Sequence, residues 1–268
     1  MLNLVNQKNI ILWQQGKWQE KGIKAYFTTK SGLGYGGRYD TLNLGINTAD
    51  TQEQVIENYK KLCKAYGLDY EYLIMTNQIH GDSIQEVIDV EKNNKPIFSH
   101  RYPNKDGFYT KISGPILVTH YADCVPVFIV DVKQKIVGVC HSGWKGTVKQ
   151  ISRKMIESYC EQEGSRLEDI EVWIGPHIGR EAFEVGEEVL LEFRSVFNKA
   201  DQFIALGEKG KGYIDLSKCI ELDLMALGLP ETNIYTMEEC TFEDSEKYYS
   251  YRRDQGDTGR MAAIITIE

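Results

Sequence analysis

Two histidines and two cysteines flank an apolar stretch between residues 120 and 146, HYADCVPVFIVDVKQKIVGVCHSGWKG. Thiolates and imidazoles bind borderline-soft metal ions such as zinc, and a cysteine beside a histidine can instead act as an activated nucleophile. The same side chains can also be structural, because free cysteine is among the residue types most often buried. The rest of the sequence has to distinguish a metal site, a nucleophile with its base, and a few core residues.

The apolar stretch predicts a β-hairpin that sorts these side chains onto two faces. A four-residue turn at 131–134 and an antiparallel register place Cys124 opposite His141. Because side chains alternate between the faces of a strand, Cys140 and Asp123 are expected on the other side, Cys140 as a small buried hydrophobe. The hairpin therefore predicts Cys124 and His141 as partners.

A metal site needs a third ligand, and three further histidines lie outside this stretch. His80 ends the strand-like segment YLIMTNQIHG, at a position where functional side chains often cluster, and it is the favoured candidate. His100 lies in an irregular polar segment, and His177 lies in a turn, GPHIGR, that could line a pocket. A His-Cys-His set leaves a fourth coordination position for water or substrate, as in catalytic zinc sites.

Strand-like and helix-like segments alternate around these residues. Helices are predicted over 50–67, 147–164, 187–197 and 215–228, the first with Asp50 as N-cap, Glu53 at the capping-box position and Gly67 as its end. Strands are predicted over 23–30, 72–81, 114–131, 135–143, 171–175, 233–240 and 259–268. This mixture of strands and helices predicts the α+β class, with mixed β-sheets flanked by helices. Because the sequence has no repeat and no linker, a single domain is expected.

Composition limits the classes of function. The chain has 268 residues with 42% hydrophobic and 26% charged residues, as expected for a globular protein that buries a core. A formal net charge of -8 argues against nucleic acid as a partner. The sequence has no apolar run of about 20 residues and no secretory leader pattern, so no membrane partner and a cytoplasmic location are expected. The six scattered cysteines are expected to be reduced thiols.

Five segments resemble, in order, the laccase-domain family, also called the polyphenol oxidase or YlmD/YfiH type: TNQIHGDSI, THYADCVPVFIVD, CHSGWKGT, WIGPHIGREAFEVG and YYSYRRDQGDTGRMAAIIT. The resemblance covers nearly the whole chain and implies one YfiH-like catalytic domain over residues 1–268. It implies a zinc-dependent purine nucleoside phosphorylase that acts on adenosine, inosine and S-methyl-5'-thioadenosine and has adenosine deaminase activity. It implies His80, Cys124 and His141 as catalytic residues and metal ligands, and TLNLG resembles the family's substrate loop at Asn43.

Phosphorolysis requires an anion site, for which the sequence offers two candidates. The turn SGWKG before a helix near Thr147 offers backbone N–H groups and Lys145. Lysine stands at 145 where many members of the family have arginine, so the bidentate fork is lost. The second candidate is the densest basic group of the chain, which consists of Arg252, Arg253 and Arg260. These arginines could instead form surface salt bridges.

Several roles stay open at this stage. Trp144 and Phe183 can stack on a purine or simply pack in the core. Asp123 adjoins Cys124 and is the nearest general acid or base in sequence, but it is expected on the other strand face. The Gly-rich segment SGLGYGG matches no phosphate-binding fingerprint and is interpreted as a loop near the substrate.

Two other functions are compatible with the same residues. A copper-dependent polyphenol oxidase of the multicopper type needs many histidines in H-x-H pairs, whereas this chain has five histidines and no such pair, although a single copper ion can occupy a Cys-His site. A metal-free hydrolase would use Cys124 as nucleophile and His141 as base.

Overall fold

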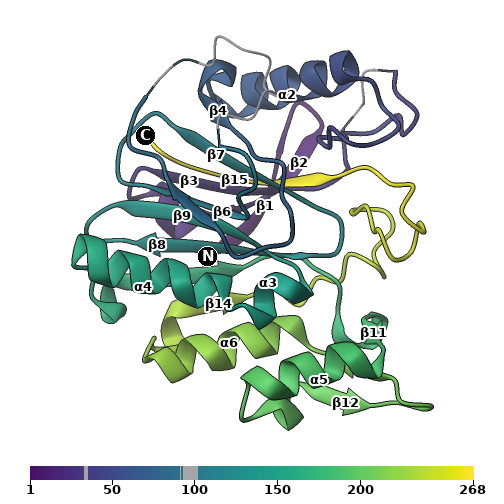
Figure 1. Ribbon diagram of the computed structural model, residues 1–268. Helices are drawn as coiled ribbons and strands as arrows, with labels where there is room; N and C mark the ends of the chain where they lie inside the picture. Colours follow the sequence, from purple (N-terminus) through teal and green to yellow (C-terminus); the bar gives the residue numbers. More distant parts are fainter. Residues whose placement is uncertain (33–35, 91, 93–101) are drawn as a thin grey trace.

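The structure is a computed structural model that describes residues 1–32, 36–90, 92 and 102–268. Figure 1 shows two mixed β-sheets that lie against each other, with α2 above the first sheet and α4 and α6 below the second. Most neighbouring strands are antiparallel, and the pairs β4–β7, β5–β6 and β10–β14 are parallel. The predicted α+β class with mixed sheets and flanking helices is therefore confirmed.

The strands of the described residues form three sheets. The first sheet has the order β1 (Leu2–Gln7), β2 (Ile10–Gln15), β3 (Ile23–Thr28), β15 (Met261–Ile267), β7 (Ile116–Tyr121) and β4 (Leu73–Ile74). The second has the order β14 (Ile234–Thr236), β10 (Ile170–Ile174), β8 (Val125–Asp131), β9 (Ile136–Ser142), β6 (Gly107–Thr110) and β5 (Ile84–Glu86). A small third sheet consists of β11 (Glu184–Val185), β13 (Gly212–Ile214) and β12 (Ile204–Leu206).

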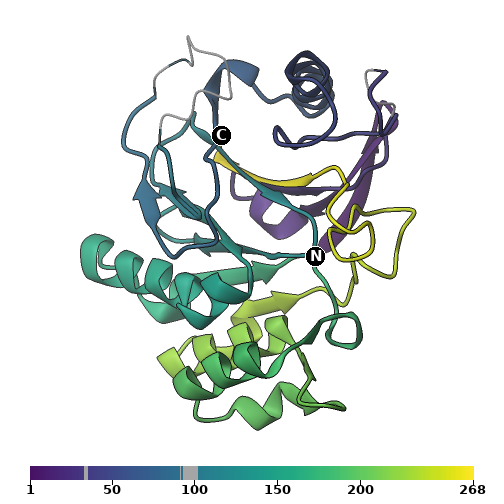
Figure 2. The ribbon, with the colours of Figure 1, turned by 45° about the vertical axis from the view of Figure 1, so that its right-hand side comes forward.

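The α-helices are α1 (Gly16–Gln19), α2 (Gln52–Tyr66), α3 (Trp144–Val148), α4 (Ile151–Glu163), α5 (Glu187–Val196) and α6 (Leu216–Leu227). Short 3-10 turns cover Tyr70–Tyr72, Leu167–Asp169, Arg180–Ala182, Ala200–Gln202 and Glu231–Asn233. Within the described residues, no helix is long and apolar enough to cross a membrane. In the turned view of Figure 2, α5 and α6 lie together at the end of the molecule farthest from α2.

Three apolar layers hold the sheets and helices together, and strand alternation assigns each side chain to a layer. On β15, Ala262 and Ile264 pack with α2, whereas Ala263 and Ile265 face the second sheet. The third layer fills the space between the second sheet and helices α4, α5 and α6. Burial on both faces explains why the central strands read as continuous apolar runs.

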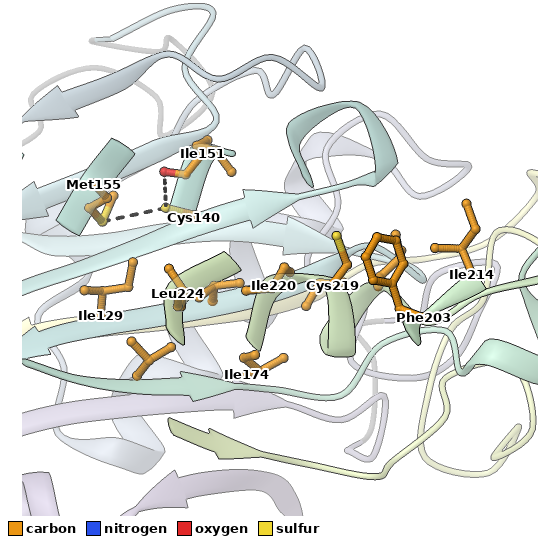
Figure 3. Close-up of a cluster of buried hydrophobic side chains, with 14 of the residues drawn as sticks. Ile129, Cys140, Ile151, Met155, Ile174, Phe203, Ile214, Cys219, Ile220 and Leu224 are labelled. Carbon is orange, nitrogen blue, oxygen red and sulfur yellow. Dashed lines mark hydrogen bonds between the residues drawn. The ribbon is translucent and has the colours of Figure 1, made fainter. Parts of the chain in front are cut away.

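Cys140 belongs to this third layer, as the predicted face alternation requires. Figure 3 shows its sulfur beside the sulfur of Met155, 3.7 Å away, and the carbonyl oxygen of Ile151, 3.9 Å away. Its side chain is fully buried, and burial raises the pKa of the thiol. Cys140 is therefore a structural residue. All six cysteines are free, as predicted.

The predicted hairpin register is wrong by two residues. The turn is shifted by one residue, so that Asp131 pairs with Ile136 and His141 pairs with Pro126. A shift of two residues keeps the same faces, because side chains alternate with a period of two. Cys124, one residue before β8, therefore still lies on the His141 side of the hairpin, with its sulfur next to Gly143.

Other predicted boundaries also need correction. The N-cap of helix α2 is Thr51, not Asp50, and its capping-box partner is Gln54, not Glu53, while the end at Gly67 is confirmed. The helix predicted over 147–164 is two helices, α3 and α4, since Gln150 adopts a left-handed conformation with φ 58°. The segment 72–81 is mostly loop, because only β4 pairs with a neighbouring strand.

Candidate metal centre and substrate cavity

A cavity of about 530 Å³ opens where the two large sheets meet at one end. The connection from β7 to β8 crosses from the first sheet to the second there. The loop after β4, the segment before β15 and residues from 45–47 and 178–183 also line the cavity. The lining residues are Gly45, Ile46, Asn47, Thr76, Asn77, Gln78, His80, His120, Ala122, Asp123, Cys124, His141, Ile178, Phe183, Tyr251, Arg252 and Arg260. The volume is within the range of small-molecule sites.

His80, Cys124 and His141 converge in this wall. Their ligand-type atoms all lie within 4.8 Å of one another, and in the described part of the chain they are the only such group of three or more His, Cys or acidic residues. The two imidazoles meet edge to face, with ring centroids 4.8 Å apart. His80 is exposed and His141 is buried, so the group has one side toward protein and one toward the cavity.

Asp106 fixes two of these three residues. Its fully buried carboxylate accepts a hydrogen bond of 2.9 Å from Nδ1 of His141, which leaves Nε2 of that ring for a metal or for the thiol. The same carboxylate accepts backbone N–H bonds from Ile79, His80 and Gly81, at 3.2, 2.9 and 2.8 Å. Burial opposes ionisation, but His141 and these N–H groups lower the pKa of Asp106, so the carboxylate is charged.

The left-handed backbone at His80 is part of this arrangement. His80 has φ 59°, and the three successive N–H groups that point at Asp106 hold the loop in that conformation. The loop after β4 thus presents the imidazole toward the end of β9, although the two lie 61 residues apart in the sequence.

Gly143 leaves the room in which the ligand side chains meet. A Cβ atom at this position would lie 3.0 Å from the sulfur of Cys124 and 3.2 Å from Cδ2 of His80. Any larger residue would therefore push the thiol and the imidazole apart. The glycine in the motif HSGW is explained by this close approach.

The pKa of the Cys124 thiol is lowered in this setting. Burial alone raises its pKa, but attraction and hydrogen bonding from His141 and His80 outweigh burial and lower the pKa to about 6. Burial likewise disfavours the charged form of His141, whereas Cys124 and Asp106 raise its pKa to about 9. A thiolate at neutral pH is the form required both for metal binding and for nucleophilic attack.

The remaining substrate residues predicted from the sequence have three different locations. Arg252 lines the mouth of the cavity, 5.4 Å from the centroid of the Phe183 ring. Asn43 is fully buried behind the wall, where its side-chain oxygen accepts N–H bonds from Gly45 and Arg260, both at 2.9 Å. Lys145 is exposed on the five-residue helix α3 and does not line the cavity.

The other histidine candidates do not join the site. His177 is buried away from the cavity, and Nδ1 of its ring lies 2.8 Å from the carbonyl oxygen of Gly175. His100 lies outside the described residues, as does part of the segment SGLGYGG.

Asp123 lines the cavity but its carboxylate is occupied. One oxygen accepts a bond of 2.8 Å from the Thr241 hydroxyl, and the other accepts bonds from the Ser250 hydroxyl and the Arg252 backbone N–H, at 3.0 and 2.7 Å. These bonds tie the β7–β8 connection to the C-terminal segment. Asp123 therefore shapes the cavity, and no proton-transfer role is assigned to it.

Sequence reasoning missed Asp106, His120 and Gln78. Asp106 precedes a short strand, and nothing in its local sequence indicates a partner for His141. His120 lines the cavity, with its Nε2 2.7 Å from the Tyr59 hydroxyl. The Gln78 amide is bonded to the backbone N–H and C=O of His120, at 2.6 and 2.9 Å, which joins the His80 loop to β7. The one sequence signal for His120 is its place at the start of the segment 120–146, which also contains Cys124 and His141.

The three ligand-type residues fit a zinc ion. Imidazole nitrogen and thiolate sulfur are both zinc donors, and bonds of about 2.0 to 2.3 Å place tetrahedral ligand atoms about 3.5 Å apart. Closing from the present spacing requires movements of roughly 1 Å, which the exposed His80 side chain can make. The Asp106–His141 hydrogen bond is the carboxylate–histidine arrangement that usually supports a metal ligand.

Several known proteins are similar to this chain over most of its length. The purine nucleoside phosphorylase YlmD of Bacillus subtilis is 34% identical over 257 residues, covering 96% of this chain and 92% of that protein. A protein named adenosine deaminase RL5, from an unknown prokaryotic organism, is 30% identical and covers 90% of this chain and 92% of its own length. The crystal structure of YlmD from Geobacillus stearothermophilus has a TM-score of 0.86 at 32% identity, covering 92% of each chain.

A family model described as multi-copper polyphenol oxidoreductase laccase matches residues 24–268, which include every lining residue of the cavity. The His80–Cys124–His141 group and the cavity beside it therefore occur in a chain that belongs to the multi-copper polyphenol oxidoreductase laccase family, with relatives named as YlmD and YfiH purine nucleoside phosphorylases.

Proposed function

We propose that this protein is a purine nucleoside phosphorylase that also deaminates adenosine, with its active site at the His80–Cys124–His141 group. Adenosine, inosine and S-methyl-5'-thioadenosine are the proposed substrates, together with inorganic phosphate. The observation that carries the proposal is the convergence of three zinc-type ligands in the wall of a cavity of about 530 Å³. The names of the relatives, phosphorylases and one deaminase, support both activities.

Different residues of the chain would bind the metal, orient its ligands and contact the purine. His80, Cys124 and His141 would hold zinc, and Asp106 keeps the His141 ring in the orientation that directs Nε2 toward the other two ligands. A zinc ion there would act as a Lewis acid and activate water near neutral pH. The rings of Phe183 and Tyr251 line the same cavity and offer aromatic faces to a purine.

A single assay separates the two proposed activities. Purified protein loaded with zinc is incubated with adenosine, with and without phosphate, and the products are separated by chromatography. We expect adenine and ribose 1-phosphate with phosphate, and inosine without it. Intact adenosine under both conditions would contradict the proposal, and the same incubation with inosine tests phosphorolysis independently of deamination.

A metal-free hydrolase is the second candidate, and the acidity of the Cys124 thiol is the observation that favours it. A pKa of about 6 beside His141 also suits a cysteine nucleophile with a histidine partner. Chelation and alkylation distinguish the two functions. If activity survives removal of metal and a covalent adduct of substrate with Cys124 is trapped, the hydrolase is correct and the metal site is not.

Copper is the alternative ion for the same ligands. Its intrinsic affinity for nitrogen and sulfur donors exceeds that of zinc, so a copper-dependent polyphenol oxidase is tested by loading each ion in turn. We expect zinc-loaded protein to cleave nucleosides and copper-loaded protein to show no phenol oxidation above that of free copper.

A further inference from the structure

Arg260 is a half-buried cation in the cavity wall whose hydrogen-bonding capacity is only partly used. Its Nη1 donates to the carbonyl oxygens of Thr258 and Gly259, at 2.9 and 2.8 Å. Its guanidinium carbon lies 5.8 Å from the centroid of the Tyr251 ring. Across the described residues, Nε and Nη2 have no hydrogen-bond partner, and no carboxylate forms an ion pair with Arg260. The edge formed by Nε and Nη2 is the geometry that binds two oxygens of one oxyanion.

The neighbouring cations are engaged differently. Arg253 forms a two-point ion pair with Asp254, at 2.8 and 3.1 Å, and donates to three backbone carbonyls, so its guanidinium is fully used in the fold. Arg252 is exposed at the cavity mouth and donates to the Glu184 carbonyl at 2.9 Å. Lys145 does not reach the cavity. Arg252 and Arg260 both line the cavity, and neither forms an ion pair with a carboxylate among the described residues, but Arg252 is exposed whereas Arg260 is half-buried.

The fold holds the Arg260 side chain in place. Asn43 accepts the backbone N–H of Arg260 and that of Gly45 with the same oxygen, which joins the two segments. Gly45 then lies so close to Arg260 that a Cβ atom on it would be 2.4 Å from Cγ of the arginine. Residue 45 must therefore be a glycine for the Arg260 side chain to pass beside the backbone at this position. Asn43 positions both Gly45 and Arg260 through its hydrogen bonds to their backbone N–H groups.

The charge of the cavity favours an anion although the chain as a whole is acidic. Apart from the His80–Cys124–His141 group, the lining includes two arginines and one carboxylate, and that carboxylate, Asp123, already accepts three hydrogen bonds. Burial lowers the pKa of Arg260, and attraction to Cys124 partly offsets this, which places the two groups within electrostatic range. An oxyanion bound at Arg260 would lie in the same cavity as the His80–Cys124–His141 group.

We propose that the Nε–Nη2 edge of Arg260 binds the phosphate cosubstrate, an assignment that rests on the proposed phosphorylase function. In the reaction, an oxygen of hydrogen phosphate forms a bond to C1' of the ribose while the bond from C1' to N9 breaks. The electron pair of that bond stays with the purine, which takes up the proton that hydrogen phosphate gives up. Arg260 acts by holding the attacking oxyanion in the cavity.

The test compares the KM for phosphate across matched variants. Arg260→Lys keeps the charge but loses the two-point contact, and we expect the KM for phosphate to rise roughly tenfold, and roughly a hundredfold in Arg260→Gln. We expect the KM for nucleoside to change less than about threefold, because the base and ribose bind elsewhere. Lys145→Gln and Arg180→Gln each remove an exposed positive charge outside the cavity, and both should keep the wild-type KM for phosphate.

The outcome that overturns the assignment is a folded Arg260→Lys or Arg260→Gln protein with an unchanged KM for phosphate. If Arg260→Gln does not fold, Arg260→Lys with a wild-type melting temperature decides the question. A rise in the KM for phosphate in Lys145→Gln alone would move the site to α3 and overturn it as well.

Phosphate binding without turnover separates this assignment from the proposed function. Inorganic phosphate is titrated calorimetrically into wild-type and Arg260→Lys protein in the absence of nucleoside. If the wild type cleaves no nucleoside but binds phosphate through Arg260, the proposed reaction fails while the anion site holds. If the wild type is a phosphorylase and Arg260→Lys binds phosphate equally well, the anion site fails alone.

A nucleotide phosphate group is the other oxyanion that Arg260 can bind, and AMP is the probe for it. We expect AMP to compete with phosphate only weakly and to be a poor substrate compared with adenosine plus phosphate. Tight AMP binding that depends on Arg260, with no binding of inorganic phosphate, would overturn the assignment to the cosubstrate.

Discussion

Asp106 accepts a hydrogen bond of 2.9 Å from Nδ1 of His141 and, with the same carboxylate, the backbone N–H of His80. One buried side chain thus orients a ligand on β9 and fixes the loop that presents a ligand from a distant part of the chain. The carboxylate thus holds the His141 ring and the backbone at His80, whereas the His80 side chain is exposed and can move to close on a metal ion.

Replacing Asp106 by asparagine should weaken the metal site. The amide group brings two N–H donors toward backbone N–H groups that now donate to the carboxylate, and the negative charge beside His141 is lost. We expect metal affinity to fall about 10- to 100-fold, as is typical for partners of metal ligands, with a parallel loss of activity. Competition with a chelator measures the affinity. Asp82→Asn, at a half-buried residue paired with Lys154, is the matched control and should leave affinity unchanged.

A methyl group at Gly143 should separate the ligands. The added Cβ of Gly143→Ala would lie 3.0 Å from the sulfur of Cys124, so the thiol or the His80 ring has to move. We expect metal affinity to fall roughly tenfold, because functional sites lose affinity when their side chains are displaced by more than about 0.5 Å. Gly186→Ala is the control, since the atoms nearest to its new methyl group belong to the exposed, flexible Glu188 side chain. Wild-type affinity in Gly143→Ala would show that the crowding is absent.

The acidity of Cys124 predicts its reactivity in the metal-free protein. Because its pKa is lowered to about 6, the ionised fraction rises as the pH passes through this value, and the thiol is mostly thiolate at pH 7. We expect the rate of alkylation by iodoacetamide to rise around pH 6 and to level off above pH 7, as mapped by mass spectrometry. Cys219, whose pKa is raised by burial, should stay unmodified. A Cys124 rate that rises only above pH 8 would contradict the described electrostatics.

The sequence predicted those parts of the fold in which one local pattern dominates. Helix α2 follows from its apolar periodicity and from Gly67, which ends it with φ 62°. The faces of Cys124 and Cys140 were also predictable, because an error of two residues in register preserves the alternation. Sequence periodicity could not predict the position of the turn, and the turn sets the register of the hairpin.

The rest of the site depends on contacts between distant segments. Asp106 meets His141 across 35 residues, and Arg260 meets Asn43 across 217, and no local pattern encodes either contact. The break at Gln150 between α3 and α4 likewise depends on a single left-handed residue within a helical pattern. Two-residue strands such as β4 and β11 are too short to show any periodicity.

The measurement that tests the central claim most directly is the metal content and phosphorolytic activity of single alanine variants. His80→Ala, Cys124→Ala and His141→Ala should each lose bound zinc and nucleoside cleavage together, because a three-ligand site that loses one ligand no longer binds tightly. Cys140→Ala, the buried cysteine on the opposite face, should retain both and lose only stability, by about 1 kcal/mol. Elemental analysis that finds full zinc in any of the three ligand variants, or full activity in one that has lost its zinc, would contradict the account.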